Sequence, residues 1–480
     1  MNDFFAPDGW LNLTLEHIND FLWTYILIGA LVLGGLYFTW RTRFVQFRMI
    51  GEMVRLLGDS TSKMATTRLK TKQKHISSFQ AFAVSVATRV GTGNLAGVAT
   101  AIAVGGPGAV FWMWLIALIG AATAFVESTL AQLYKRKGEV SFTGGPAYYI
   151  LHGLHSRWMA GLFAVLMTLT FGLSYNSIQS NTICGAMSQA FNFDPIVVGI
   201  VLAAVALVIA FGGIHRIANV SSVVVPFMAI SYFLLAVFII GTNIDKVPHV
   251  FKVIIDSAFG VGPFAGGAIG ITMMNGIKRG LFSNEAGEGS APNVAATAHV
   301  THPVKQGLIQ SLGVFTDTLL VCSCTAFIIL LSGLYSNPEL NGVNLTQAAL
   351  ESEIGSAGST VVAIAIFFFA FSSIIGNYYY GEANIQFLTR KRWVLQVFRI
   401  LSGGVMVIFG ALASLDLVWS LGDVCMALLT ACNLVAIFFL GKYAFRLLND
   451  YRAQKRQGIK DPIFSRDKLP EIAHDLECWE

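Results

Sequence analysis

The chain has 480 residues, of which 55% are hydrophobic and only 12% are charged, with a net charge of +5. A soluble protein carries roughly a quarter charged residues, and one water-soluble core cannot bury this much apolar surface. The mean hydropathy of +0.64 therefore predicts an all-α integral membrane protein whose solvent is lipid. Lys and Arg do not form runs interleaved with aromatic residues, which argues against a nucleic-acid partner.

A membrane-spanning helix needs about 20 mostly apolar residues. Residues 1–20 contain no Lys or Arg, so they do not resemble a cleavable signal peptide and are predicted to be an extracytoplasmic N-terminus. The polar segment 441–480 is predicted to be a cytoplasmic tail. Between them we expect eleven spans, at about 21–40, 79–104, 108–134, 157–186, 194–212, 219–241, 262–297, 306–334, 357–384, 393–413 and 416–440.

The orientation follows from Lys and Arg, which concentrate in cytoplasmic loops. The segment 41–74 is rich in both. With eleven spans, strict alternation places the basic clusters at 135–137 and 390–392 and the C-terminal tail on that same side. We therefore expect a multi-pass protein of the cell (inner or plasma) membrane, with its N-terminus outside and its C-terminus in the cytoplasm.

Two predicted spans are interrupted by glycine and polar residues. The second contains Gly91-Thr92-Gly93-Asn94, and the seventh contains four glycines and four charges between residues 275 and 289. Irregular backbone at membrane depth persists only where it lines a cavity or binds a ligand, and charge at that depth usually marks function. The alternative is that these glycines serve tight packing between helices.

The positions of the interruptions suggest an internal repeat. Apart from one extra N-terminal helix at 21–40, the transporter domain 21–440 divides into two blocks of five spans, repeat one at about 79–241 and repeat two at about 262–440. Because five is odd, the blocks enter the membrane in opposite senses. A broken helix that opens each half of a 5+5 inverted repeat is typical of secondary transporters.

A broken helix offers two kinds of backbone group. The N–H groups that begin the second half-helix suit a carboxylate, and the carbonyls that end the first suit a cation. Thr92 and Gly93 would present amides to a substrate carboxylate, while the carbonyls of 87–90 and the side chain of Asn94 would serve Na⁺. A zwitterionic amino acid with Na⁺ is the expected cargo, and no other cofactor is expected.

The run Gly105-Gly106-Pro107-Gly108-Ala109-Val110-Phe111-Trp112-Met113-Trp114-Leu115-Ile116-Ala117-Leu118-Ile119-Gly120 resembles the signature of the alanine or glycine:cation symporter family, also called the sodium:alanine symporter family. The stretches 91–97, 144–146 and 282–287 add to the resemblance, which covers about residues 20 to 450. It implies a leucine-transporter-type core of ten helices plus one extra helix, carrying alanine, glycine or related amino acids with sodium.

The resemblance also implies roles for individual residues. It assigns the substrate carboxylate to Thr92 and Gly93, the substrate ammonium to Gln179, and a wall of the pocket to Phe282 and Ser283. The residues that would coordinate sodium, in one site or two, are Val90, Asn94, Ser283, Asp317, Ser372 and Ser373.

Some polar residues leave alternatives open. Asn275 and Asn377 occupy positions where members of the family can carry bulky aromatic residues, so the resemblance implies a more polar substrate pocket here. That departure weakens the expectation of strict alanine selectivity. Asp317 either serves a second ion or forms a structural pair with Lys278 or Arg279.

Arg89 is an unexpected charge so close to a proposed sodium site. A cation there would repel Na⁺ unless it were neutralised. We therefore predict an acidic neighbour for Arg89, either Glu285 or Glu288.

Together these observations predict a sodium-coupled symporter that imports a small neutral amino acid, such as alanine or glycine, by alternating access. The alternatives are an ion channel, which would need a continuous polar pore, and a proton-coupled transporter of another zwitterion such as glutamine or serine. The spans contain no HExxH or GxSxG motif, so an enzyme is not expected. The oligomeric state is not determined by the sequence.

Overall fold

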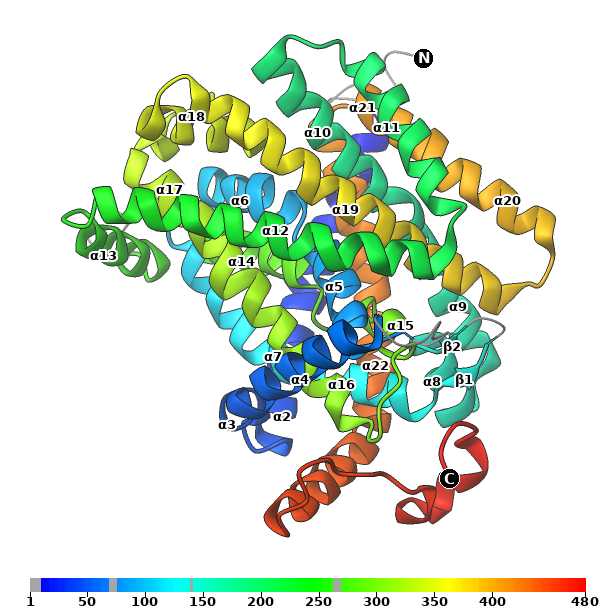
Figure 1. The fold of residues 1–480 in the computed structure, drawn as a ribbon. Helices are drawn as coiled ribbons and strands as arrows, with labels where there is room; N and C mark the ends of the chain where they lie inside the picture. The colour runs from blue at the N-terminus through cyan, green and yellow to red at the C-terminus, as the bar shows by residue number, and fades with distance from the viewer. Residues whose placement is uncertain (1–9, 69–75, 139–140, 262–268) are drawn as a thin grey trace.

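The computed structural model describes residues 10–68, 76–138, 141–261 and 269–480, and helices dominate it (Figure 1). The first helices are α1 (Trp10–Leu22), α2 (Ile28–Arg41), α3 (Val45–Arg48), α4 (Ile50–Arg68), α5 (Ser78–Arg89), α6 (Val98–Gly105) and α7 (Ala109–Leu133). A two-stranded antiparallel sheet, β1 (Arg136–Lys137) with β2 (Phe142–Thr143), follows.

The remaining α-helices are α8 (Pro146–Gly153), α9 (Arg157–Met167), α10 (Tyr175–Phe191), α11 (Pro195–Ala210), α12 (Gly213–Thr242), α13 (Val247–Ala258), α14 (Ile269–Asn284), α15 (Ala291–Ala295), α16 (Val304–Val314), α17 (Ser323–Ser332), α18 (Gly342–Ile354), α19 (Ala357–Leu388), α20 (Arg392–Ile400), α21 (Met406–Leu412) and α22 (Leu415–Arg456). Single π-helical turns join α1 to α2, α9 to α10, α16 to α17 and α20 to α21, and another, Gly93–Gly97, precedes α6. Short 3₁₀ turns lie at Leu334–Ser336, Arg466–Lys468 and Pro470–Asp475.

Within the described residues, 8 helices are long and apolar enough to cross a membrane. They correspond to eight of the predicted spans. The other three predicted spans contain shorter helices, namely α5 with α6, α11, and α14 with α15. The chain is therefore a multi-pass, all-α membrane protein, while the count of eleven spans and the inverted repeat remain predictions.

One face of α12 shows how the sequence fits a lipid solvent. Val223, Phe227, Ile230 and Leu234 recur at helical spacing and are 59–67% exposed. The opposite face, which includes Tyr232, is buried against other helices. An apolar stripe that faces outward would be unfavourable in water but is favourable in contact with acyl chains.

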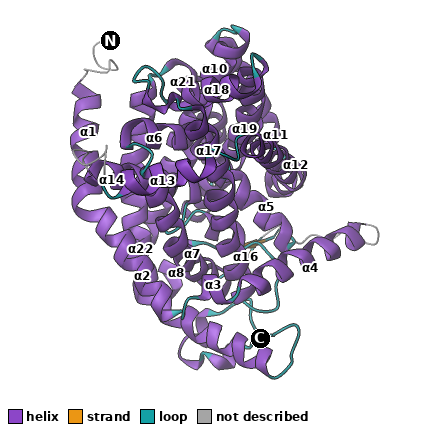
Figure 2. Cartoon of the chain, turned by 90° about the vertical axis from the view of Figure 1, so that its left-hand side faces the viewer, coloured by secondary structure: helices purple, strands orange, loops and turns teal. Residues whose placement is uncertain are grey.

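Two helices extend beyond the predicted spans. The first helix begins at Trp10 instead of residue 21, because α1 packs along α22. At the other end, α22 continues past residue 440 to Arg456, because Leu447, Leu448 and Tyr451 keep one face of it buried. In Figure 2, α1 lies toward the end of the molecule opposite to the C-terminus.

Candidate functional site

The first predicted interruption is a break between α5 and α6. Ser77 caps α5 in a reciprocal pair with Gln80, and the α-helix ends at Arg89. The backbone is then irregular until the π-turn that begins at Gly93, and Asn94 Oδ1 accepts a hydrogen bond from Gly91 N (2.9 Å). A Cβ at Gly91 would clash with the hydroxyl of Ser373, so only glycine permits this close approach of α19.

The second predicted interruption is a break between α14 and α15. Helix α14 ends at Asn284, and the backbone then takes positive φ angles at Glu285 (56°), Gly287 (98°) and Gly289 (79°). L-residues rarely adopt this left-handed region, and glycine at two of the three positions reduces its cost. Both interruptions are therefore confirmed as true breaks in helices.

The two serines predicted on the long helix 357–384 lie beside the first break. Ser373 Oγ is 2.8 Å from the carbonyl oxygen of Ala87 and 3.2 Å from that of Thr88. Ser372 Oγ is 3.4 Å from Ala87 O but only 2.8 Å from Phe369 O of its own helix. Hydroxyl and carbonyl oxygens thus converge where α5 ends, and Ser373 is the better placed of the pair. Val90 lies fully buried in the adjacent break.

A second cluster of oxygen atoms surrounds Asp317, on the π-helical turn between α16 and α17. Its carboxylate accepts hydrogen bonds from Asn94 Nδ2 (2.7 Å), Ser283 Oγ (2.9 Å) and Thr318 Oγ1 (2.8 Å). Asn94 Nδ2 also lies 3.3 Å from Cys322 Sγ. The three residues proposed for a second ion, Asn94, Ser283 and Asp317, are therefore in direct contact.

The residues assigned to the substrate surround the Thr92 amide. Gln179 Oε1 on α10 accepts a hydrogen bond from Thr92 N (2.9 Å). Gly93 packs against Phe282 and Ser283, where an added Cβ would lie 3.1 Å from the nearest atoms. The Phe282 ring contacts the Tyr175 and Trp419 rings, with centroids 4.8 and 4.6 Å apart. Three aromatic rings therefore form one wall beside the first break.

Asn377 lies one helical turn beyond Ser373 on the same face of α19. It is 1% exposed, and neither its Nδ2 nor its Oδ1 has a hydrogen-bond partner among the described residues. An unsatisfied buried amide is costly, at about 1–3 kcal/mol for each unpaired group. The structure does not bring Asn275 to this site, since it packs against Gly105 at the far end of α6 and donates to Ile271 O (2.9 Å).

The structural alternative for Asp317, a pair with Lys278 or Arg279, is wrong. Both basic side chains bind Asp423 of α22 instead, at 3.0 and 2.6 Å, and Arg279 also stacks on Trp419. The sequence contained a signal for this pairing, because Asp423 is an acid inside the last predicted span, where a partner of opposite charge is needed.

The acidic neighbour predicted for Arg89, Glu285 or Glu288, does not form a direct ion pair with it among the described residues, although Glu285 binds the adjacent Thr88. Over the residues that the structure describes, Arg89 forms no ion pair with either acid; its Nη1 donates to Gln310 O (3.1 Å) of α16. The last turn of α5 directs the guanidinium toward α16, where Gly313 leaves space for it. Glu285 accepts from the hydroxyls of Thr88 (3.2 Å) and Ser290 (2.5 Å), and Glu288 from that of Tyr175 (3.3 Å).

The chain is similar to members of one protein family over nearly its whole length. The model of the sodium:alanine symporter family matches residues 8–466. The probable sodium/glutamine symporter GlnT of Bacillus subtilis is 52% identical, with 97% of this chain and 96% of that protein covered. The amino-acid carrier protein AlsT of the same organism is 48% identical, with 98% of each covered. The sodium/alanine symporter AgcS of Methanococcus maripaludis is 36% identical, with 88% and 93% covered.

Proposed function

The chain belongs to the sodium:alanine symporter family, and from this premise we propose that it imports a small neutral amino acid together with Na⁺ by alternating access. The proposal includes eleven spans in a 5+5 inverted repeat plus one extra helix, with the N-terminus outside and the C-terminus in the cytoplasm. Sodium is the coupling ion, and no other cofactor takes part.

The observation that carries sodium coupling is the position of Ser373. Its hydroxyl oxygen lies within 3.2 Å of the carbonyl oxygens of both Ala87 and Thr88, at the C-terminal end of the first half-helix. Oxygen ligands of this kind suit a hard cation, and the helix end adds a partial negative charge. A bound Na⁺ would attach the long helix α19 to the inner half of the first broken helix.

The substrate would bind on the other side of the same break. Its carboxylate would take the amides of Thr92 and Gly93 at the start of the second half-helix. Without substrate, Gln179 Oε1 occupies the Thr92 amide at 2.9 Å. A carboxylate that displaces Gln179 from this amide frees its oxygen to accept from the substrate ammonium. Substrate binding would therefore replace each polar contact that it breaks.

The cluster around Asp317 supports a second cation, either Na⁺ or a proton. Asn94 connects this cluster to the first break, since its Oδ1 accepts from Gly91 N and its Nδ2 donates to Asp317. A cation on Asp317 would compete with Asn94 Nδ2 for the carboxylate and, through Asn94 Oδ1, would act on the backbone beside the substrate amides. Coupling of this kind is reciprocal, because substrate would raise the affinity for the cation by the same factor.

Glutamine is the second candidate substrate, and Asn377 favours it. A methyl side chain leaves the buried amide of Asn377 without partners, whereas a carboxamide offers both a donor and an acceptor. The relative of 52% identity is named a probable sodium/glutamine symporter. Alanine remains the first candidate, because the matching family model is that of the sodium:alanine symporters, and glycine, the next smaller neutral amino acid, stays beside it.

The test is uptake of radiolabelled alanine, glycine, serine and glutamine into proteoliposomes under an inward Na⁺ gradient, with a matched K⁺ gradient as the control. Accumulation above equilibrium with Na⁺ alone would support symport and rank the substrates. Flux that does not saturate would favour a channel, and accumulation driven by a pH gradient without Na⁺ would favour proton coupling.

A further inference from the structure

The residues after α22 are not a loose polar extension. The chain turns at Gly458 (φ 83°), just after α22. Residues 459–480 then fold back against the rest of the molecule (Figures 1 and 2). Its apolar side chains are at most 7% exposed at five positions: Phe464, Leu469, Ile472, Leu476 and Trp479. We call 459–480 the terminal segment. Burial this complete indicates a docked element.

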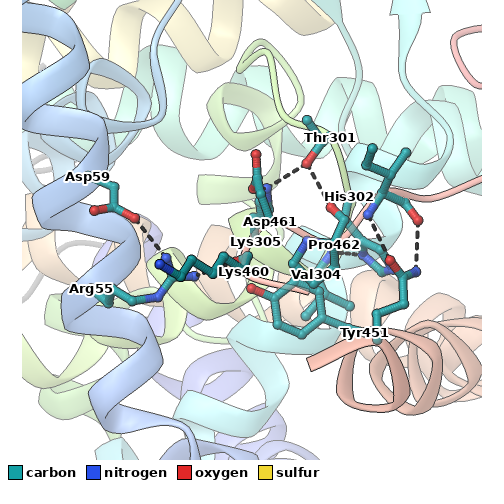
Figure 3. Close-up of polar contacts among 12 residues, drawn as sticks. Arg55, Asp59, Thr301, His302, Val304, Lys305, Tyr451, Lys460, Asp461 and Pro462 are labelled. Carbon is teal, nitrogen blue, oxygen red and sulfur yellow. Dashed lines mark hydrogen bonds and ion pairs between the residues drawn. The ribbon is translucent and has the colours of Figure 1, made fainter. Parts of the chain in front are cut away.

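The terminal segment binds the loop that joins α15 to α16. Phe464 N donates to Thr301 O (2.9 Å), and the Thr301 hydroxyl donates to Pro462 O (2.8 Å). Asp461 forms an ion pair with Lys305, in the first turn of α16. Figure 3 shows Thr301 and Lys305 beside Asp461 and Pro462. Two backbone carbonyls and one ion pair therefore fix the segment to this loop.

Helix α4 provides a further contact with the terminal segment. Arg55 donates to the carbonyl oxygen of Lys460 (3.3 Å) and pairs with Asp59 of its own helix (2.8 Å), as Figure 3 shows. Tyr451, near the end of α22, donates to Glu52 (2.5 Å). Helix α4 thus lies against both α22 and the beginning of the terminal segment.

The end of the terminal segment binds the end of α7. Trp479 Nε1 donates to the carbonyl oxygens of Gln132 and Leu133, each at 3.1 Å. The Lys135 ammonium lies between the rings of Trp479 and Phe142, 4.4 Å from each centroid, and donates to Gln132 Oε1 (2.9 Å). Cation–π contacts and a hydrogen bond therefore order Gln132.

Gln132 connects Trp479 to the inner half of the second broken helix. Its Nε2 donates to the carbonyl oxygens of Ala295 (2.5 Å), the last residue of α15, and of Ala298 (2.9 Å), in the loop that follows. Ala295 O also accepts from the Ala298 N–H (3.3 Å), so Gln132 adds a second hydrogen bond to this carbonyl. Trp479 therefore contacts the same residue, Gln132, whose side chain binds the end of α15.

The same loop holds the inner half of the first broken helix. His299 N donates to Ile76 O (3.2 Å), and Ile76 pairs with Ala298 in a parallel bridge just before α5 begins. Helix α5 is held further by Ser85, whose hydroxyl donates to Gln310 Oε1 of α16 (2.5 Å). Residues 295–301 thus join the inner ends of both broken helices, and the terminal segment covers that junction.

We propose that the terminal segment is a strap that holds the inner ends of α5 and α15 together and so restrains opening of the transport site toward the cytoplasm. The inference rests on the proposed transport function, because alternating access moves one repeat or bundle against the other and the half-helices beside the site take part in that motion. Release of the strap would remove the contacts at Thr301 and Gln132 together, and opening would become more frequent.

The test measures how often the inner end of α5 opens in protein reconstituted in nanodiscs. A Ser85→Cys reporter in a Cys478→Ser background is buried when α5 packs on α16, and its labelling rate with a water-soluble maleimide reports separation. We expect labelling at least tenfold faster in Trp479→Ala and in Phe464→Ala. Trp479→Phe keeps a ring over Lys135 but loses the indole N–H, and we expect an intermediate rate.

Arg446→Ala is the matched control. It removes an exposed ion pair with Glu471 and a hydrogen bond to Lys468 O (3.0 Å), which join α22 to the terminal segment away from Thr301 and Gln132. We expect a rate within twofold of the parent protein. Thermal unfolding of each variant identifies loss of the fold, and Thr301→Val replaces any alanine variant that fails to fold.

Equal labelling rates in the parent protein and the folded strap variants would overturn the proposal. Failure of the proposed function is a separate result, since it would appear as absent Na⁺-driven uptake by the parent protein in proteoliposomes. The labelling rates do not depend on that uptake.

Discussion

Replacement of Ser373 by alanine tests the proposed sodium site most directly. The hydroxyl lies 2.8 Å from Ala87 O and 3.2 Å from Thr88 O, so the change removes one oxygen from the set that would surround the ion. A hydrogen bond to a charged group contributes about 1.5–3 kcal/mol. An ion–hydroxyl contact of similar strength corresponds to roughly a 10- to 100-fold loss of affinity. Fold stability should fall by only about 1 kcal/mol, the contribution of a typical neutral hydrogen bond.

The assay is the Na⁺ concentration that gives half-maximal amino-acid uptake, measured in proteoliposomes at fixed substrate. Ser372→Ala is the matched control, because its hydroxyl donates to Phe369 O at 2.8 Å and lies 3.4 Å from Ala87 O. We expect a change of about threefold or less for the control, as for the loss of a weak contact. An unchanged half-maximal Na⁺ concentration in folded Ser373→Ala would refute the assignment. Equal effects of the two substitutions would refute the ranking of the serines.

Three further predictions concern the first break, the residue Asn377 and helix α4. Gly91→Ala should abolish Na⁺-driven uptake while leaving expression intact, because its Cβ would clash with the Ser373 hydroxyl; uptake at the parental rate would contradict this. Asn377→Leu should lower the ratio of glutamine to alanine uptake at least tenfold, as expected when a polar partner is lost, and an unchanged ratio would exclude contact. Burial alone would raise the pKa of Glu52, but hydrogen bonds, chiefly from Arg55, outweigh it and lower the pKa from 4.5 to about 2. The stability that Glu52 contributes is therefore complete above pH 4.5 and is lost between pH 4.5 and 2, so protease cleavage within α4 should be equal at pH 7 and pH 5.

The sequence determined the class of protein and the positions of the two breaks. Long apolar stretches require helices in lipid, since only backbone hydrogen bonds within the segment satisfy its polar groups there. Glycine and polar residues at 91–94 and 285–289 were visible as interruptions because such residues cannot continue an ordinary lipid-facing helix. The sequence analysis grouped Asn94, Ser283 and Asp317 as residues of one ion site, and in the structure the first two contact Asp317.

The expectations about charge pairing that failed concern the direction of a buried side chain. Neither Glu285 nor Glu288 pairs with Arg89, and Asp423 takes both basic residues that were considered for Asp317. The sequence lists the charges at membrane depth, but the rotation of each helix about its axis decides which of them meet. That rotation is set by packing against several neighbours at once.

Composition and periodicity therefore determined which segments form helices in lipid and which are interrupted. The reason is that the cost of an unpaired backbone group in lipid is local and depends on the segment alone. Tertiary structure decided which of two adjacent serines faces the break, where Asn275 and Asn377 lie, and that a polar C-terminal stretch docks through Phe464 and Trp479. These outcomes depend on contacts between residues hundreds of positions apart, such as Trp479 with Gln132, and no local pattern in the sequence contains them.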